Sequence, residues 1–349
     1  DLVIGFQLTH SGRFCRPHVQ RPPEPRVAYR HPLLDGKFGV RSDDQVMTDA
    51  EIGPLLERYV AAARIAAAAG ADFVDLKHCH GYLLHEFLGA HVRPGKYGGS
   101  FENRTRILRE LVGAIRASGN RIDLGVRLSA FYCVPFRPDP ARSAPRKPGP
   151  GLPEDFRAFL PYQYGFGVNP LDPVQPDLTE AFQFMALCGE LGIKVLNLTA
   201  GSPYYNPHIQ RPAAYPPSDG YQPPEDPLAG VARQIQAVRQ LKARAPSGLL
   251  LVGSAYSYLQ EYMPHVAQAV LRASWVDVVG IGRAVLSYPR ILADAVATGR
   301  LQTRRICRTF SDCTTAPRSG LVSGCYPLDR HYAKRPEAAT LKAIKRNAG

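Results

Sequence analysis

Short apolar segments alternate with longer segments of helical period along most of the 349-residue chain. The apolar segments are rich in Val, Ile and Leu, as in parallel strands that are covered on both faces. The segments predicted as strands are 3–8, 72–78, 122–129, 194–200, 249–255 and 277–284. The segments predicted as helices are 48–69, 101–118, 178–192, 229–243, 259–273 and 287–298. Six β-α repeats of this kind predict an α/β fold with a parallel sheet.

Two helix starts carry clear local signals. Thr48 is predicted as the N-cap of the first helix, and Gly70 follows its alanine-rich end. In YGGSFENR, the two glycines predict a tight turn and Ser100 predicts the N-cap of the next helix. These residues are therefore predicted to belong to the scaffold.

Polar residues just past the strand ends distinguish a barrel from a doubly wound sheet. They are Gln7, Lys77, His80, Arg127, Thr199, Ser254 and Arg283. Residues from many strands that converge on one face are typical of a closed (β/α)8 TIM barrel. A barrel needs eight strands, so we expect this chain, which starts at Asp1 without a Met, to lack the first two.

We expect residues 1–300 to form strands three to eight of the barrel and residues 301–349 to form a cysteine-containing C-terminal extension. Two long segments, 131–177 and 203–227, are dense in proline and aromatic residues. Because both follow strands, we expect them to be lids over the carboxyl-end face.

Composition limits the class of partner. The chain has 43 basic and 30 acidic residues, a net charge of +13 that favours phosphorylated small molecules. The basic residues form no tract interleaved with aromatics, which argues against nucleic acid. Seven cysteines suggest reduced thiols. The sequence shows neither a long apolar run nor a signal peptide, so we expect a cytoplasmic protein with no membrane partner. A homo-oligomer is compatible with the sequence.

Five motifs then occur in succession. They are QLTHSGR (7–13), HGYLLHEFL (80–88), YGGSFENRTR (97–106), GVRLS (125–129) and VGIGRA (279–284). In order and spacing they resemble the old yellow enzyme family of FMN-dependent oxidoreductases, which are (β/α)8 barrels. The resemblance covers most of the chain from its third family strand onward.

The resemblance implies a flavin site. Arg127 matches the family arginine at the N1/O2 edge of the ring, where a positive charge stabilises the reduced flavin, and Gln7 matches a glutamine that hydrogen-bonds the ring. Arg127 is also open to a strand-end salt bridge, and Gln7 to a helix cap. At the last two strands, glycines that let backbone N–H groups approach an anion predict a phosphate cradle. Its members are Gly253, Ser254, Gly282 and Arg283.

The stretch DLKHCHGYLLHEFL supplies the implied catalytic residues. Tyr82 matches the family tyrosine that protonates the substrate, and His80 matches the second member of the pair that polarises a substrate carbonyl. Lys77 replaces the histidine that is usual as the first member. This lysine is open to binding an anionic substrate group, to acting as a nucleophile, or to a salt bridge with Asp75. Strand alternation predicts that His78 points away from the barrel axis.

The C-terminal cysteines differ from those of family members that hold a [4Fe–4S] cluster. Cys307, Cys313 and Cys325 match three ligand positions, but Phe310 occupies the fourth. Since four thiolates normally hold such a cluster, we predict no metal and treat these cysteines as a remnant. A zinc site would need a further ligand such as His331. Second-tier candidates for substrate contacts are Tyr204, Tyr205, Asn206 and His208.

The resemblance implies an enzyme that passes hydride from NAD(P)H through FMN to a small organic acceptor such as an activated alkene. One alternative is a dehydrogenase of the same family that oxidises a small substrate. Another is a Schiff-base lyase or aldolase that uses Lys77 as its nucleophile, and a third is a barrel without catalytic activity.

Overall fold

The computed structural model describes residues 2–18, 21–145 and 147–348, with side chains up to residue 346. Contacts within the chain divide it into two compact units. The first unit comprises Asp1–Pro135, Glu154–Ser202 and Leu241–Val252, and the second comprises Phe136–Pro153, Pro203–Gln240 and Gly253–Gly349. The predicted boundary at residue 300 stays a prediction.

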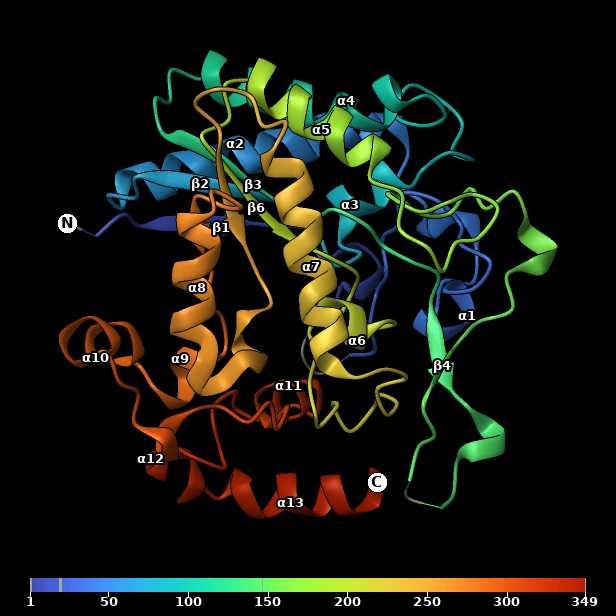
Figure 1. The fold of residues 1–349 in the computed structure, drawn as a ribbon. Helices are drawn as coiled ribbons and strands as arrows, with labels where there is room; N and C mark the ends of the chain where they lie inside the picture. Colours follow the sequence, from blue (N-terminus) through green and yellow to red (C-terminus); the bar gives the residue numbers. More distant parts are fainter. Residues whose placement is uncertain (1, 19–20, 146, 349) are drawn as a thin grey trace. The chain divides into compact units, whose positions relative to one another are not determined.

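A parallel sheet forms the centre of the first unit (Figure 1). Its strands, in spatial order, are β1 (Gly5–Leu8), β2 (Phe73–His78), β3 (Asp123–Ser129), β6 (Val195–Thr199) and β7 (Leu250–Gly253). In the second unit, Gly280 N–H donates to the carbonyl of Gly253 at 2.8 Å, directly after β8 (Val278–Val279). All six predicted strands are therefore present, and the α/β class is confirmed.

Every predicted helix is also present. The helices of the first unit are α1 (Asp35–Phe38), α2 (Ile52–Ala68), α3 (Leu83–Leu88), α4 (Phe101–Ala117) and α5 (Thr179–Glu190). The later helices are α6 (Pro207–Gln210), α7 (Pro227–Lys242), α8 (Met263–Arg272), α9 (Ala284–Ser287), α10 (Ile291–Thr298), α11 (Asp312–Arg318), α12 (Arg330–Ala333) and α13 (Glu337–Ala348).

Two boundaries differ from the prediction because of proline. The helix expected over 287–298 begins only at Ile291, as α10, and the short α9 ends at Ser287, since the residue before Pro289 disfavours helical backbone. The helix expected from residue 259 begins its regular α-helical part at Met263, where Pro264 occupies the first turn. A 3₁₀ segment, Tyr256–Tyr262, precedes it.

The predicted helix-start signals are confirmed. The Thr48 hydroxyl donates to Glu51 at 2.8 Å, and the two residues form a capping box ahead of α2. The Ser100 hydroxyl accepts the N–H of Asn103 at 3.3 Å and caps α4. The preceding Gly98 lies against the carbonyl of Arg93 so closely that a Cβ atom there would overlap it.

The sheet of the first unit has one apolar and one polar face. Helices α2, α4 and α5 lie on one side of its strands in Figure 1. On β2, the residues Val74, Leu76 and His78 are buried, and His78 packs against Phe184 of α5 at 5.5 Å between ring centroids. His78 thus faces the helices, as strand alternation predicts. The opposite face carries the half-buried residues of β2.

A buried ionic cluster joins the segment after β1 to the segment after β2. Arg13 is 1% exposed, and its Nη1 lies 2.5 Å from Asp35 Oδ1 while its Nε lies 2.8 Å from Glu86 Oε1. Glu86 Oε2 accepts the N–H of Ala28 at 3.1 Å. Charge-assisted bonds of this kind fix geometry, so α3 is held in place beside the first strand.

Of the two long segments predicted as lids, 203–227 belongs to the second unit, and 131–177 is divided between the units, with Phe136–Pro153 in the second. Within 131–177, strands β4 (Phe136–Pro138) and β5 (Gly151–Pro153) pair antiparallel. Segment 203–227 carries α6. The role of both segments as lids stays a prediction. In the part of the chain that the structure describes, no helix combines the length and apolar character needed to cross a bilayer.

The close approach at Gly98 predicts an asymmetry between two glycine substitutions. Gly98→Ala should lower the free energy of unfolding by about 1–3 kcal/mol, because the added methyl group overlaps the Arg93 carbonyl. Gly113→Ala, inside α4 with open space around it, should raise it by about 0.5–1 kcal/mol. Urea unfolding followed by circular dichroism measures both. Equal effects of the two substitutions on the free energy of unfolding would contradict the close approach of Gly98 to the Arg93 carbonyl.

Two buried histidines, His78 on β2 and His85 on α3, predict loss of stability in acid. Burial lowers the pKa of His78 to about 4 and that of His85 to about 3. The unfolded chain binds protons at both sites below about pH 6.5, and the folded chain does not. The contribution of the two neutral histidines to the free energy of unfolding is therefore complete above about pH 6.5 and is lost as the pH falls towards 4.

Urea unfolding between pH 7.5 and 4.5 measures this dependence. His78→Leu should make the fall in unfolding free energy shallower, because it removes one of the two sites. The exposed His265→Leu serves as control and should keep the wild-type slope. A wild-type slope in the His78 variant would show that its titration does not couple to folding.

Candidate active site

The polar face of the sheet is built in layers by strand register. The Phe73 ring of β2 lies against Gly5 on β1 and Gly125 on β3. A Cβ atom at either glycine would meet this ring. In the next layer, Gln7 is in register with Asp75, and Gln7 Nε2 donates to Asp75 Oδ2 at 2.6 Å. Because both neighbouring strands carry a glycine here, the Phe73 ring has room to cover this layer of the polar face.

The third layer carries two cations. Lys77 is in register with Arg127, and Arg127 in turn with Asn197. Because residues in register on parallel strands point to the same face, these side chains share one surface with Gln7 and Asp75. The sequence predicts Gln7, Lys77 and Arg127 at one edge, and the register brings them onto neighbouring strands.

The electrostatics of this face are set by burial and by the two cations. Burial raises the pKa of Asp75, opposed by the hydrogen bond from Gln7 and by the charges of Arg127 and Lys77. Burial also lowers the pKa of Lys77, and Arg127 lowers it further. Within the described residues, Asp75 Oδ1 and Arg127 Nε are buried without a hydrogen-bond partner.

A tight turn returns the chain above this face after β2. His80 has φ +65° and Gly81 has φ +76°, so two consecutive left-handed residues reverse the backbone. Tyr82 then occupies the N-cap position of α3. The Lys77 ammonium lies 3.3 Å from the centroid of the Tyr82 ring, a cation–π contact.

The turn is fixed by hydroxyl groups from the end of β3 and from the segment after β6. The N–H of His80 donates to Ser129 Oγ at 3.0 Å, and Ser202 Oγ donates to the carbonyl of His80 at 2.8 Å. Ser129 Oγ also donates to the carbonyl of Gly201 at 3.0 Å. Sequence reasoning missed Ser129 and Ser202, although both directly follow or end predicted strands. Their role depends on backbone atoms, for which a sequence carries no signal.

The predicted phosphate residues lie at the end of β7 and after β8, within the second unit. Gly253 accepts the hydrogen bond from Gly280, and a Cβ at Gly253 would lie 3.1 Å from Tyr256 Oη. Gly282 has open space around it, and Ser254 follows Gly253. Arg283 is the residue that precedes α9.

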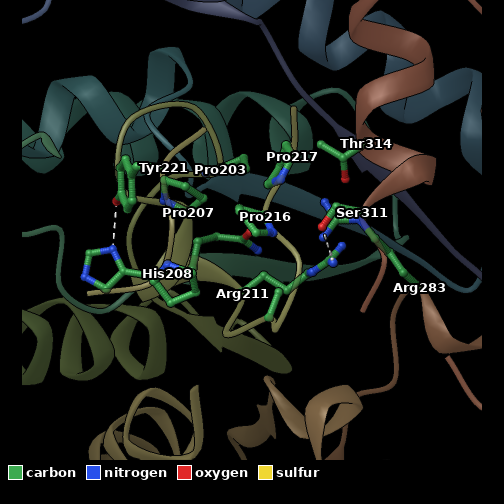
Figure 2. A pocket seen from close by; sticks show the side chains of 13 residues that line it. Pro203, Pro207, His208, Arg211, Pro216, Pro217, Tyr221, Arg283, Ser311 and Thr314 are labelled. Atoms are coloured by element: carbon green, nitrogen blue, oxygen red, sulfur yellow. Dashed lines mark hydrogen bonds between the residues drawn. The ribbon is translucent and has the colours of Figure 1, made fainter. Parts of the chain in front are cut away.

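Arg283 also lines a pocket of the second unit that Figure 2 shows from close by. Arg211, Ser311 and Thr314 line the same pocket, and Arg211 Nη2 donates to Ser311 Oγ at 2.8 Å. The Thr314 hydroxyl is buried without a partner among the described residues. Two guanidinium groups and two hydroxyl groups suit an anion. Sequence reasoning missed Arg211, Ser311 and Thr314, because they are far from the strand ends.

The second-tier aromatic residues pack within the same unit. His208 Nδ1 and Tyr221 Oη are 2.7 Å apart, and a dashed line on the left of Figure 2 marks this hydrogen bond. Arg318 lies 4.9 Å from the ring centroid of Tyr204. Tyr205 and Asn206 are buried. A substrate contact for these residues stays a prediction.

The three C-terminal cysteines are free thiols. Burial raises the pKa of Cys325 to about 11, and the neighbouring Cys307 and Cys313 contribute to the increase. Phe310, at the position of the fourth ligand, stacks on Tyr215 with ring centroids 5.8 Å apart. In the described ranges, no three His, Cys, Asp or Glu side chains are arranged to hold a metal ion.

Two solved structures share the fold. The chain matches the histamine dehydrogenase from Rhizobium sp. 4-9 with a TM-score of 0.60 and 20% identity, over 93% of this chain and 38% of that one. It matches a 2-naphthoyl-CoA reductase with a TM-score of 0.60 and 19% identity, over 94% of this chain and 43% of that one. The similarity supports the barrel class of fold predicted from the strand pattern.

Sequence comparison gives relatives for the N-terminal part. The chain is 35% identical over 135 residues to flavin oxidoreductase hxnT of Emericella nidulans, covering 37% of this chain and 35% of the relative. It is 41% identical over 130 residues to 12-oxophytodienoate reductase 1 of Oryza sativa subsp. japonica, covering 36% and 34%. The chain thus spans about a third of the length of these curated relatives.

A family profile covers the same part. The profile described as the NADH:flavin oxidoreductase / NADH oxidase family matches residues 1–136. The matched residues include β1, β2 and β3 with Gln7, Lys77 and Arg127, and the turn that carries His80 and Tyr82. Residues 1–136 are thus similar to the NADH:flavin oxidoreductase / NADH oxidase family, in agreement with the old yellow enzyme family that the motifs resemble.

Proposed function

We propose that this chain is part of an FMN-dependent oxidoreductase that takes hydride from NAD(P)H and passes it to a small organic acceptor such as an activated alkene. One observation carries the proposal: Gln7, Lys77 and Arg127 share the polar face of the sheet, and Tyr82 is held against Lys77. The family match over residues 1–136 supports it.

The polar face fits the ring of FMN. Bound FMN would supply a carrier for hydride, and its ring gains negative charge at one edge on reduction. Arg127 provides a fixed positive charge and a buried Nε–H that has no partner among the described residues. Gln7, held by Asp75, provides an amide group for a second hydrogen bond. These donors suit the ring edge that becomes anionic.

The phosphate group would be held in the second unit by Gly253, Ser254, Gly282 and Arg283. Glycines allow backbone N–H groups to approach a phosphate closely, and an arginine adds charge. Arg283 lines a pocket with Arg211 and Ser311, which supports an anionic ligand near this arginine. Gly282 has the open space that a backbone approach requires.

The turn after β2 would carry the substrate chemistry. The Tyr82 phenol is an O–H donor, and we assign to it the proton that reaches the substrate carbon. His80, whose backbone is fixed by Ser129 and Ser202, and Lys77 would orient the polar end of the substrate. A substrate held this way presents its reactive carbon to Tyr82.

A second candidate function is a Schiff-base lyase or aldolase. It is favoured by Lys77, whose pKa burial lowers, because a neutral amine is the nucleophile in that chemistry. Treatment with borohydride in the presence of a small aldehyde would reduce an imine and add mass to Lys77. A flavin-free protein that is trapped in this way would favour the lyase.

The flavin proposal predicts a yellow protein with a spectrum that depends on Arg127. The purified protein should show flavin absorbance that bleaches on anaerobic addition of NADH or NADPH. Arg127→Met should weaken FMN binding by about 10–100-fold, because a charge-assisted hydrogen bond is lost. The exposed Arg121→Met is the matched control and should bind FMN like wild type. Equal affinity in the two variants would refute the role of Arg127.

The proton-donor assignment predicts a selective kinetic defect. Tyr82→Phe should slow the oxidation of the reduced enzyme by an activated alkene by about 10²-fold or more, because the phenolic proton is removed. Reduction by NAD(P)H should be nearly unchanged. Stopped-flow absorbance separates the two half-reactions, and Tyr59→Phe on α2 is the control tyrosine. A similar loss in both half-reactions would rule out proton donation by Tyr82.

A further inference from the structure

Lys77 is a half-buried cation on the polar face whose charge is not balanced by an ion pair. Among residues 2–18, 21–145 and 147–348, no carboxylate forms a salt bridge with its ammonium. Asp75, two positions earlier on the same face, instead accepts the hydrogen bond from Gln7. The salt bridge between Lys77 and Asp75, left open by the sequence, is therefore absent.

The ammonium is directed to the turn rather than to the neighbouring carboxylate. It lies 3.3 Å from the centroid of the Tyr82 ring, and the backbone around Tyr82 is fixed by the Ser129 and Ser202 hydroxyls. An aromatic ring contacts an ammonium on one side only, whereas the ammonium has three N–H groups that can donate hydrogen bonds. The remaining donors lie beside the proposed proton donor.

The charge balance of this face favours an anion. Lys77 and Arg127 contribute two positive charges, while Asp75 contributes at most one negative charge. If Arg127 serves the flavin ring, the charge on Lys77 is left to the substrate. A partly desolvated cation gains more from an anionic group than from a neutral carbonyl, since an unpaired buried charge is costly.

We propose that Lys77 determines substrate class, selecting acceptors that carry a carboxylate next to the reactive double bond. This inference rests on the proposed function, because it takes Tyr82 as the proton donor and Arg127 as a flavin ligand. Lys77 binds the carboxylate, and the adjacent double bond lies beside Tyr82. Neutral amides or ketones of the same shape bind more weakly because they leave the ammonium without a counter-charge.

Binding of a matched pair of probes tests the inference. trans-Cinnamate and trans-cinnamamide have nearly the same shape and differ in charge. Calorimetric titration of the purified protein should show that cinnamate binds at least about tenfold more tightly than cinnamamide. Lys77→Met should abolish this preference, and Lys77→Arg should keep most of it. Lys96→Met removes an exposed lysine that lies over the ring of Tyr97, and should leave the preference unchanged.

The outcomes separate this inference from the flavin proposal. A preference for cinnamate that persists in Lys77→Met, or is absent from the wild type, overturns the role of Lys77, and normal flavin absorbance in the same samples would leave the flavin proposal standing. A preference that depends on Lys77 in a protein without flavin absorbance supports the anion site and overturns the flavin proposal. Retention in Lys77→Arg excludes misfolding as the cause of a loss in Lys77→Met.

Discussion

The parallel register of β1, β2 and β3 is the constraint on which the candidate site depends. It sets Gln7 beside Asp75 and Lys77 beside Arg127, so residues far apart in the chain become immediate neighbours. A shift of one residue in any of these strands would turn its polar side chains towards the helices. The glycines beside Phe73 and the buried apolar residues of the other face oppose such a shift.

The turn that follows β2 brings Tyr82 to the polar face of the sheet. Two left-handed residues, His80 and Gly81, reverse the chain, and the cluster of Arg13, Asp35 and Glu86 holds the helix that follows. As a result, the Tyr82 ring is held against the Lys77 ammonium. A histidine at positive φ costs conformational energy, which the surrounding hydrogen bonds offset.

Lys77 stands where the family pattern has a histidine, and this difference changes the kind of substrate group that the site favours. A neutral histidine pair polarises a carbonyl, whereas an unpaired ammonium favours a full negative charge. The family profile matches residues 1–136, and the chain spans about a third of the length of its curated relatives. The activity of the whole protein is therefore a proposal that depends on this segment and on the second unit, which carries Arg283 and its pocket.

The sequence by itself determined the order and type of the elements. Unbroken apolar runs identify buried parallel strands, and local signals such as Thr48 and Ser100 fix helix starts, because both depend on nearby residues. It also predicted Gln7, Lys77, Arg127 and Tyr82 as site residues. Only the tertiary structure decided that Lys77 faces Tyr82 and not Asp75, and that Arg211, Ser311 and Thr314 share a pocket with Arg283. The physical reason is that side-chain pairing and backbone-mediated contacts depend on distances between segments far apart in the chain, which local pattern does not encode.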